Sequence, residues 1–279
     1  IRDLRMSRGL GDVYKRQIWY TPVTGIWQTV WLEPVPRAHF RRVDITPDLD
    51  SRTVAFDYVL SRGDLEAEIE VSFQGKLVAR SREPVFRSGG RTILALDKER
   101  LGRDNFTSAC AWSPKHPNLF DVTYRLYEDG ALTDTVRGYF GLRKISVENG
   151  VICLNNYPFY QKLLLDQGYW RDSLLTAPTD EAFVSDIQYC KAMGFNGVRK
   201  HQKVEDPRFL YHADRLGLLV WGEMANAFEF SGDYVRRFTK EWMEMLERDY
   251  NHPCIVCWGV SNEITISCLL YTSDAADDK

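Results

Sequence analysis

Three charged residues follow short apolar segments of the kind that forms buried β-strands. Arg199 ends one segment, Glu223 ends the strand that begins with Leu218–Trp221, and Glu263 comes just after Ile255–Val260. Nearly continuous apolar runs are typical of parallel strands covered on both faces. In a parallel barrel the carboxyl ends of the strands carry the reacting groups. A carboxylic acid in such a partly desolvated mouth, near a second carboxylate, acquires a raised pKa and can act as a general acid.

The segments that position these residues alternate between strand and helix from residue 161 to residue 260. Gln161–Leu165 is the first expected strand, Thr179 is placed to cap a helix, and Asp206-Pro207 starts a second helix in the preferred cap order. A longer helix is expected from about Asp233 to Tyr250. The run fits four strands of a parallel barrel or of a doubly wound sheet, and periodicity does not separate the two.

Apolar spacing predicts which helical residues face the core. They are Phe183, Ile187, Cys190 and Met193 in the first helix, Phe209, Leu210, Ala213 and Leu216 in the second, and Phe238, Trp242, Met245 and Leu246 in the third.

Residues 41–143 have a different pattern, in which apolar and polar residues alternate as in half-buried strands. Val54–Leu60 and Leu65–Phe73 are the clearest examples. Asp129-Gly130 predicts a hairpin turn, and so does Asn155-Asn156 between Val151–Leu154 and Phe159–Leu164. Several short strands without a helical period indicate an immunoglobulin-like β-sandwich.

The two ends differ in character from the rest of the chain. Residues 1–17 have neither a helical nor a strand period, and residues 267–279 depart abruptly from what precedes them. Both resemble translated adapter read-through at the ends of metagenomic fragments, so neither is expected to belong to the fold. Trp27–Glu33, between Gly25 and Pro34, is predicted to be the last strand of a domain that lies mostly upstream.

The composition argues against several classes of protein. A formal charge of −3 provides no basic face for a nucleic acid, and no apolar run approaches the roughly 20 residues of a membrane helix. Six dispersed cysteines suit reduced thiols in a cytoplasmic protein. Cys254 and Cys257 have CxxC spacing, but on a strand they would point to opposite faces. The histidines show no ligand spacing, so no metal and no cofactor are expected.

Four groups of motifs occur in order along the chain. They are Thr24–Glu33 (TGIWQTVWLE), Trp112-Ser113-Pro114 with Pro117–Phe120 (PNLF), Tyr139–Arg143 (YFGLR) and Asn251–Glu263 (NHPCIVCWGVSNE). Together they resemble glycoside hydrolase family 2, the family of β-galactosidases, β-glucuronidases and β-mannosidases. The resemblance covers about residues 20–266. It implies the tail of a jelly-roll domain, an immunoglobulin-like domain and the first half of a (β/α)8 barrel.

The resemblance also implies roles for site residues. Glu263 matches the general acid/base of a retaining glycosidase, which works with a second carboxylate about 5–5.5 Å away. Asn262 is similar to the asparagine that hydrogen-bonds the sugar 2-hydroxyl, although a turn or cap asparagine is an alternative. Arg199 matches an arginine near the nucleophile, and a structural ion pair is its alternative. The nucleophile itself belongs to a seventh strand that this chain does not reach.

Other positions leave two interpretations open. Glu223 occupies the position at the end of the third strand where the family has an acidic residue. Its carboxylate could equally hold a neighbouring side chain in place or contact the sugar directly. His201 lies near the family's histidine after the second strand, with an offset local pattern. After the first strand the chain departs from the family's glycine-asparagine-arginine-histidine run, so Trp170 and Tyr169 are either a stacking wall for the sugar or packed side chains.

The expectation is therefore a multi-domain β plus α/β protein. Residues 18–36 end a jelly-roll domain, residues 37–143 form the sandwich, and residues 144–266 form the N-terminal half of a TIM barrel. The parent enzyme is expected to bind a carbohydrate and to hydrolyse O-glycosyl bonds of β-linked sugars. Homo-oligomerisation of the full-length parent is possible. The fragment alone is expected to be inactive. Secretion stays open because the natural N-terminus is missing. The alternatives are a non-catalytic carbohydrate-binding protein with a degenerate barrel and a different barrel hydrolase of the same clan.

Overall fold

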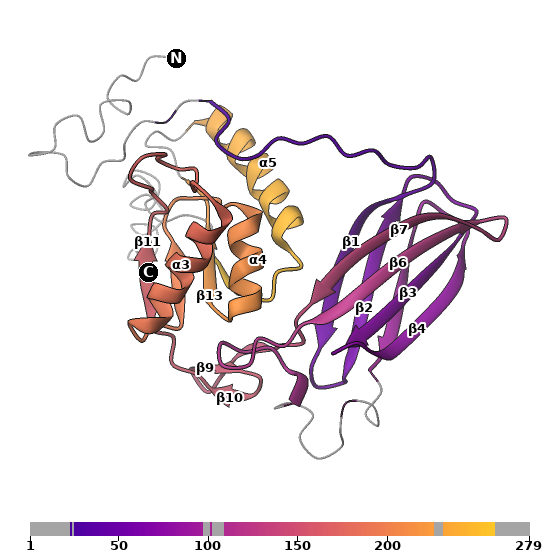
Figure 1. Cartoon of the computed structure of the whole chain (residues 1–279), viewed down its shortest axis with the longest axis horizontal. Helices are drawn as coiled ribbons and strands as arrows, with labels where there is room; N and C mark the ends of the chain where they lie inside the picture. Colours follow the sequence, from indigo (N-terminus) through magenta and orange to yellow (C-terminus); the bar gives the residue numbers. More distant parts are fainter. Residues whose placement is uncertain (1–22, 24, 97–100, 102–108, 226–230, 260–279) are drawn as a thin grey trace, which may run out of the picture.

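The computed structural model of the protein defines residues 23, 25–96, 101, 109–225 and 231–259. Figure 1 shows two parts, a β-rich part and a part in which helices cover a sheet. A small antiparallel sheet follows the β-rich part along the chain. It consists of β8 (Ile145–Glu148), β9 (Val151–Leu154) and β10 (Tyr157–Pro158), in the order β10-β9-β8. In the ranges given above, no helix combines the length and the apolar character needed to cross a membrane.

The β-rich part consists of two antiparallel sheets with orders β1-β2-β5 and β4-β3-β6-β7. The strands are β1 (Phe40–Asp48), β2 (Thr53–Leu60), β3 (Leu65–Phe73), β4 (Lys76–Val85), β5 (Gly89–Ala95), β6 (Phe120–Glu128) and β7 (Ala131–Phe140). Inward-facing residues of both sheets, such as Phe56 and Phe120, form one buried core. Each such side chain contributes about 1.5–3 kcal/mol on burial. The result is the immunoglobulin-like sandwich that the alternating pattern predicts.

Hairpin turns lie at the predicted dipeptides. Asp129-Gly130 joins β6 to β7, and Asn155-Asn156 joins β9 (Val151–Leu154) to β10 (Tyr157–Pro158). All four turn residues have positive φ, as in a type I′ turn, whose twist matches that of paired strands. The predicted arm Phe159–Leu164 is wrong, because β10 ends at Pro158. Beyond Pro158 a single backbone hydrogen bond, from the Phe159 N–H to the Ile152 carbonyl at 2.9 Å, continues the pairing.

The remaining strands are parallel and lie in the order β11-β12-β13-β14. These four parallel strands are β11 (Leu163–Asp166), β12 (Gly197–Lys200), β13 (Leu219–Glu223) and β14 (Ile255–Gly259). Three helices connect the parallel strands: α3 (Asp180–Ala192), α4 (Pro207–Leu216) and α5 (Gly232–Asp249). Strand and helix alternate as in the first half of a (β/α)8 barrel (Figure 1).

Local sequence signals set the ends of the helices. The Thr179 hydroxyl accepts a hydrogen bond from the backbone of Ala182, and the Asp206 carboxylate accepts one from the backbone of Arg208, so both predicted N-caps are confirmed. Gly217 ends α4 in the left-handed conformation, with φ 72°. A side chain at Gly217 would also meet the carbonyl oxygen of Pro114 at 2.6 Å, so this end of the helix can approach the sandwich only without one.

The predicted buried faces are confirmed for α3 and α4 but not for α5. The buried residues include Phe183, Ile187 and Cys190 of α3, and Phe209, Leu210 and Ala213 of α4. Met193, however, is 63% exposed, and Leu216 at the end of α4 is only half-buried. Of the four apolar residues expected to be buried on α5, only Met245 is; Phe238, Trp242 and Leu246 are half-buried. The helix packs beside β14, which is the edge strand of the described sheet, so one side of α5 lacks a described neighbour.

The predicted strand Trp27–Glu33 is wrong for the described residues. This segment forms no strand there, and Leu32 is 99% exposed. A strand requires a neighbour with which to exchange backbone hydrogen bonds, and no described strand pairs with it. The segment instead contacts the barrel: the Trp27 carbonyl accepts a hydrogen bond from the Thr176 hydroxyl at 2.7 Å, and the Gln28 amide donates to the Val204 carbonyl at 3.1 Å.

Candidate active site

One face of the parallel sheet carries polar side chains at the carboxyl ends of its strands. Val198 and Val220 belong to the core that lies against the helices. Because side chains alternate along a strand, Arg199 and Glu223 project from the other face, which lines the interior of the half-barrel. This is the rim at which enzymes with this architecture bind their substrates.

Arg199 and Glu223 form an ion pair on this face. The Arg199 Nε donates to Glu223 Oε2 at 2.8 Å, and the backbone N–H of Gln202 donates to Glu223 Oε1 at 3.0 Å. Glu223 is only 3% exposed, so both of its carboxylate oxygens are taken up by these two donors. The geometry favours the interpretation in which Glu223 supports Arg199 over one in which it contacts a sugar directly.

The end of β14 lies against this pair. Glu223 is in register with Gly259, and a side chain at Gly259 would lie 3.3 Å from Glu223 Cγ. Cys257 lies on the same stretch of β14, and burial is the main cause that raises the pKa of its thiol. The chain continues from Gly259 towards Asn262 and Glu263, which lie outside the described residues. The assignments of those two residues therefore stay predictions.

A cavity of about 660 Å³ opens beside the rim. It is lined by Val23, Trp27, Gln167, Tyr169, Leu175, His201, Gln202, Lys203, Val204, Met224, Ala225, Glu241, Glu244, Met245 and Arg248. His201 is 9% exposed, and its backbone N–H donates to the Asp166 carbonyl at 2.8 Å, which ties the loop after β12 to the end of β11. His201 and Tyr169 thus border a cavity at the rim, while their roles towards a sugar stay predictions.

Trp170 occupies a packed position. Its ring contacts Phe183 of α3 edge to face, with 5.9 Å between the ring centroids, and it belongs to the periphery of the core beneath the helices. This is the second of the two alternatives that the sequence leaves open. Its indole Nε1 is buried without a hydrogen-bond partner.

A buried ion cluster beneath the rim was not predicted. Lys200 forms ion pairs with the carboxylates of Asp166 and Glu205, the latter at 2.8 Å, and it is 2% exposed. Burial alone would lower the pKa of Lys200, but the two carboxylates outweigh it and raise that pKa. Lys203 pairs with Glu205 at 3.0 Å and donates to the carbonyls of Gly168 and Leu175. The cluster fixes the loop after β11 to the loop after β12.

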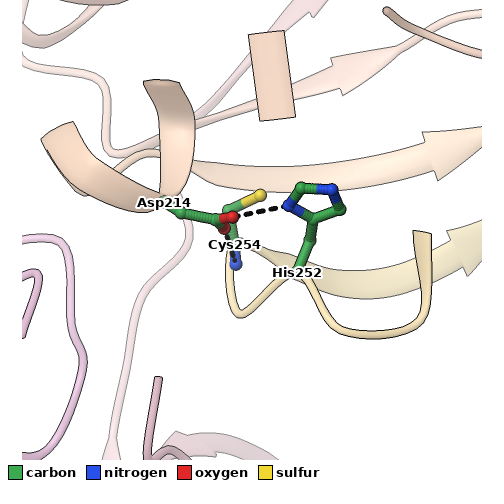
Figure 2. A group of neighbouring side chains, drawn as sticks. All are labelled: Asp214, His252 and Cys254. Atoms are coloured by element: carbon green, nitrogen blue, oxygen red, sulfur yellow. Dashed lines mark hydrogen bonds and ion pairs between the residues drawn. The ribbon is translucent and has the colours of Figure 1, made fainter. Parts of the chain in front are cut away.

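A second polar cluster lies at the opposite, N-terminal end of β14. Figure 2 shows Asp214, His252 and Cys254 directed towards one another, and their side chains are types that bind metals. His252 Nδ1 lies 2.5 Å from Asp214 Oδ2, the Cys254 backbone N–H donates to Asp214 Oδ1 at 2.9 Å, and the Tyr139 hydroxyl donates to Asp214 Oδ2 at 2.8 Å. Two ligands of one zinc ion, each about 2.0–2.2 Å from it in tetrahedral geometry, would stand farther apart than His252 and Asp214 do. Burial also keeps the pKa of the Cys254 thiol well above its usual range. The arrangement is that of a hydrogen-bonded cluster.

The chain matches sequence profiles of known proteins over most of its length. Residues 38–143 match "Glycosyl hydrolases family 2", and residues 145–276 match "Glycosyl hydrolases family 2, TIM barrel domain". The beta-galactosidase BgaC of Bifidobacterium adolescentis is 26% identical over 267 residues, which are 86% of this chain and 25% of that protein. A beta-galactosidase of Thermoanaerobacter pseudethanolicus is 28% identical over 242 residues, 85% of this chain and 32% of that protein.

Solved structures show the same fold. The crystal structure of a Bacteroides uniformis beta-glucuronidase aligns with a TM-score of 0.72 at 21% identity, covering 86% of this chain and 31% of that one. This chain therefore spans no more than about a third of the length of the proteins named here.

Proposed function

Because the chain belongs to glycosyl hydrolases family 2, we propose that it is the part of a longer retaining β-glycosidase that carries the general acid/base. The observation that supports this most directly is the Arg199–Glu223 pair on the interior face of the half-barrel, in register with the end of β14. A guanidinium held here favours the ionised state of a neighbouring carboxylate, which a nucleophile requires. The nucleophile and the other half of the barrel would come from the rest of the longer protein.

Glu263 is the proposed general acid/base, and Asn262 is the proposed partner of the sugar 2-hydroxyl. Glu263 would protonate the leaving glycosidic oxygen and then deprotonate the attacking water. Its carboxyl group would need a raised pKa, which a desolvated barrel mouth and the nucleophile's charge supply. The substrate would be a β-linked carbohydrate. The rim cavity beside His201 and Tyr169 would accommodate its aglycone.

The experiment is a substitution in the longer protein that contains this chain. Nitrophenyl β-galactoside, β-glucuronide and β-mannoside are screened first to find the sugar that is hydrolysed. Glu263→Gln should then lower kcat by about 10²–10⁴-fold, the usual contribution of a general acid/base. Glu83→Gln, which removes an exposed carboxylate of the sandwich, is the matched control and should leave turnover unchanged. Equal activity of the two variants would reject the catalytic assignment and favour a carbohydrate-binding protein.

A further inference from the structure

Parts of three of the four motif groups that carry the family resemblance meet at the joint between sandwich and barrel. Trp112 Nε1 donates to the Asp214 carbonyl at 2.8 Å, and Tyr139 donates to the Asp214 carboxylate. Pro253 packs onto Gly141 so closely that a side chain at Gly141 would lie 2.6 Å from Pro253 Cβ. These contacts surround the N-terminal end of β14. That end is opposite the rim that carries Arg199 and Glu223, so Trp112, Tyr139, Gly141 and Pro253 are not explained by contact with a sugar.

Arg143 makes the most direct connection to β14. Its Nε donates to the Pro253 carbonyl at 2.9 Å, and its Nη2 donates to the Ile255 carbonyl at 2.6 Å. One rigid guanidinium therefore fixes the carbonyls of the first strand residue, Ile255, and of Pro253 two positions before it. Arg143 comes three residues after the end of β7, so its position depends on that of the sandwich.

Asn251 makes a second connection. Its side-chain amide donates to the Val43 carbonyl at 2.8 Å and accepts from the Ile45 backbone N–H at 2.7 Å. In this way it pairs with the edge strand β1 as another strand would. The residues just before β14 are thereby held to the sandwich at two independent points.

β14 needs such a support because its pairing with β13 is interrupted. Val220 is in register with Ile255, whereas the next residue, Trp221, is in register with Cys257. The extra residue, Val256, is a bulge, and the ladder of hydrogen bonds between the two strands is locally disrupted there. A shift of one residue would turn every side chain of the strand to the opposite face.

From these contacts we infer that the sandwich sets the axial position of β14, and hence of Glu263, with Arg143 and Asn251 as positioning residues. The inference rests on the proposed function, because it assigns the position of that function's general acid. A displacement of about 1 Å at a reacting group is enough to cost on the order of 10²-fold in rate. The sandwich would then contribute to catalysis without touching the substrate.

The test compares leaving groups in the longer protein. 2,4-Dinitrophenyl and phenyl glycosides of the hydrolysed sugar are used, and kcat/KM is measured because it reports the steps up to departure of the aglycone. Dinitrophenolate leaves without a proton, whereas departure of phenolate is assisted by the general acid. Arg143→Met should therefore lower kcat/KM for the phenyl glycoside about tenfold more than for the dinitrophenyl glycoside. Arg143→Lys, which retains a donor for one carbonyl, should restore part of the difference.

Arg42→Met is the matched control. Arg42 crosses the same joint to Glu247 of α5 at 2.9 Å but has no bond to β14, so its loss should change both substrates by the same factor. If Arg143→Met does not fold, Asn251→Ala provides the same comparison, with the same expected difference between substrates. Equal losses on the two substrates, or no loss in a folded variant, would overturn the inference alone. Absence of turnover by the unaltered protein on every aryl β-glycoside would instead overturn the proposed function, and the inference with it.

Discussion

Substitution of Asp214 should reveal how much the polar cluster at the joint contributes to the stability of the protein. Asp214 is 0% exposed, and its carboxylate accepts hydrogen bonds from Tyr139, His252 and the backbone of Cys254. Asp214→Ala leaves the Cys254 backbone N–H without this acceptor and leaves Tyr139 and His252 only their long mutual contact of 3.4 Å. Each buried, unsatisfied donor costs about 1–3 kcal/mol. His252 retains access to water through its 15% exposed side chain and will cost least. The expected loss is thus about 3–5 kcal/mol, against a typical total stability of about 5–15 kcal/mol.

The assay is urea unfolding of the longer protein, followed through the barrel tryptophans. Asp180→Ala is the matched control, because that carboxylate is 47% exposed and its pair with Arg208 should be worth no more than about 1 kcal/mol. Equal unfolding midpoints for the two variants would refute the idea that Asp214 organises the joint. A chelator should leave the midpoint of the unaltered protein unchanged, since the 2.5 Å separation of His252 and Asp214 is that of a hydrogen bond. A fall in the midpoint on chelation would show instead that the cluster binds an ion.

Two further predictions concern the ion cluster beneath the rim. Lys200→Met leaves Asp166 and Glu205 buried without their shared cation and should cost about 3–5 kcal/mol in urea unfolding. The net pKa of Asp166 is lowered because Lys200 outweighs the effect of burial. The ionised Asp166 therefore stabilises the folded protein above its ordinary pKa of 3.8, and this stabilisation is lost as the pH falls through the lower pKa of the folded state. The difference in unfolding free energy between the unaltered protein and Lys200→Met should thus shrink in acid. A difference that grows in acid would contradict this. Asp186→Asn should stabilise the protein only slightly at pH 7: partial burial and the charge of Asp166 raise the pKa of Asp186 and so disfavour its ionised form, but the side chain is exposed enough for water to screen the effect. That gain should vanish below pH 3.8, and a loss of stability at pH 7 would refute the interpretation.

Local signals were sufficient for most of the fold. Alternation identified β2 and β3, and caps at Thr179 and Asp206 located the starts of α3 and α4, because these patterns depend on neighbours within one turn or one strand. The errors arose where an element depends on a distant partner. Trp27–Glu33 has the residues of a strand but no described strand to pair with, and α5 has an apolar face without a complete set of neighbours.

The site was predictable only where a strand delivers a side chain to the rim. Arg199 and Glu223 followed from that rule, and their pairing agrees with it. The cluster around Lys200 could not be found in the same way, since Asp166 lies 34 positions away and meets Lys200 only through the parallel register of β11 and β12. Asp214 and His252 are 38 positions apart, and their contact depends on how α4 approaches the start of β14. A charged residue near the end of a strand or helix is usually solvated, so sequence alone gives no sign that these residues are buried.

The position of Trp112 shows that a domain boundary along the chain need not be one in space. Trp112 comes from the segment between β5 and β6, yet its fully buried side chain packs among Phe183, Phe209 and other residues beneath the barrel helices. A barrel expressed from residue 144 onward would exclude all the sandwich strands. It would also lose Trp112, the largest of the fully buried side chains described in its core. Recombining sandwiches and barrels from different relatives at that point would likewise place a foreign tryptophan segment inside the receiving barrel. Exchange between such proteins is therefore expected to succeed only when the segment around Trp112 travels with the barrel it fills.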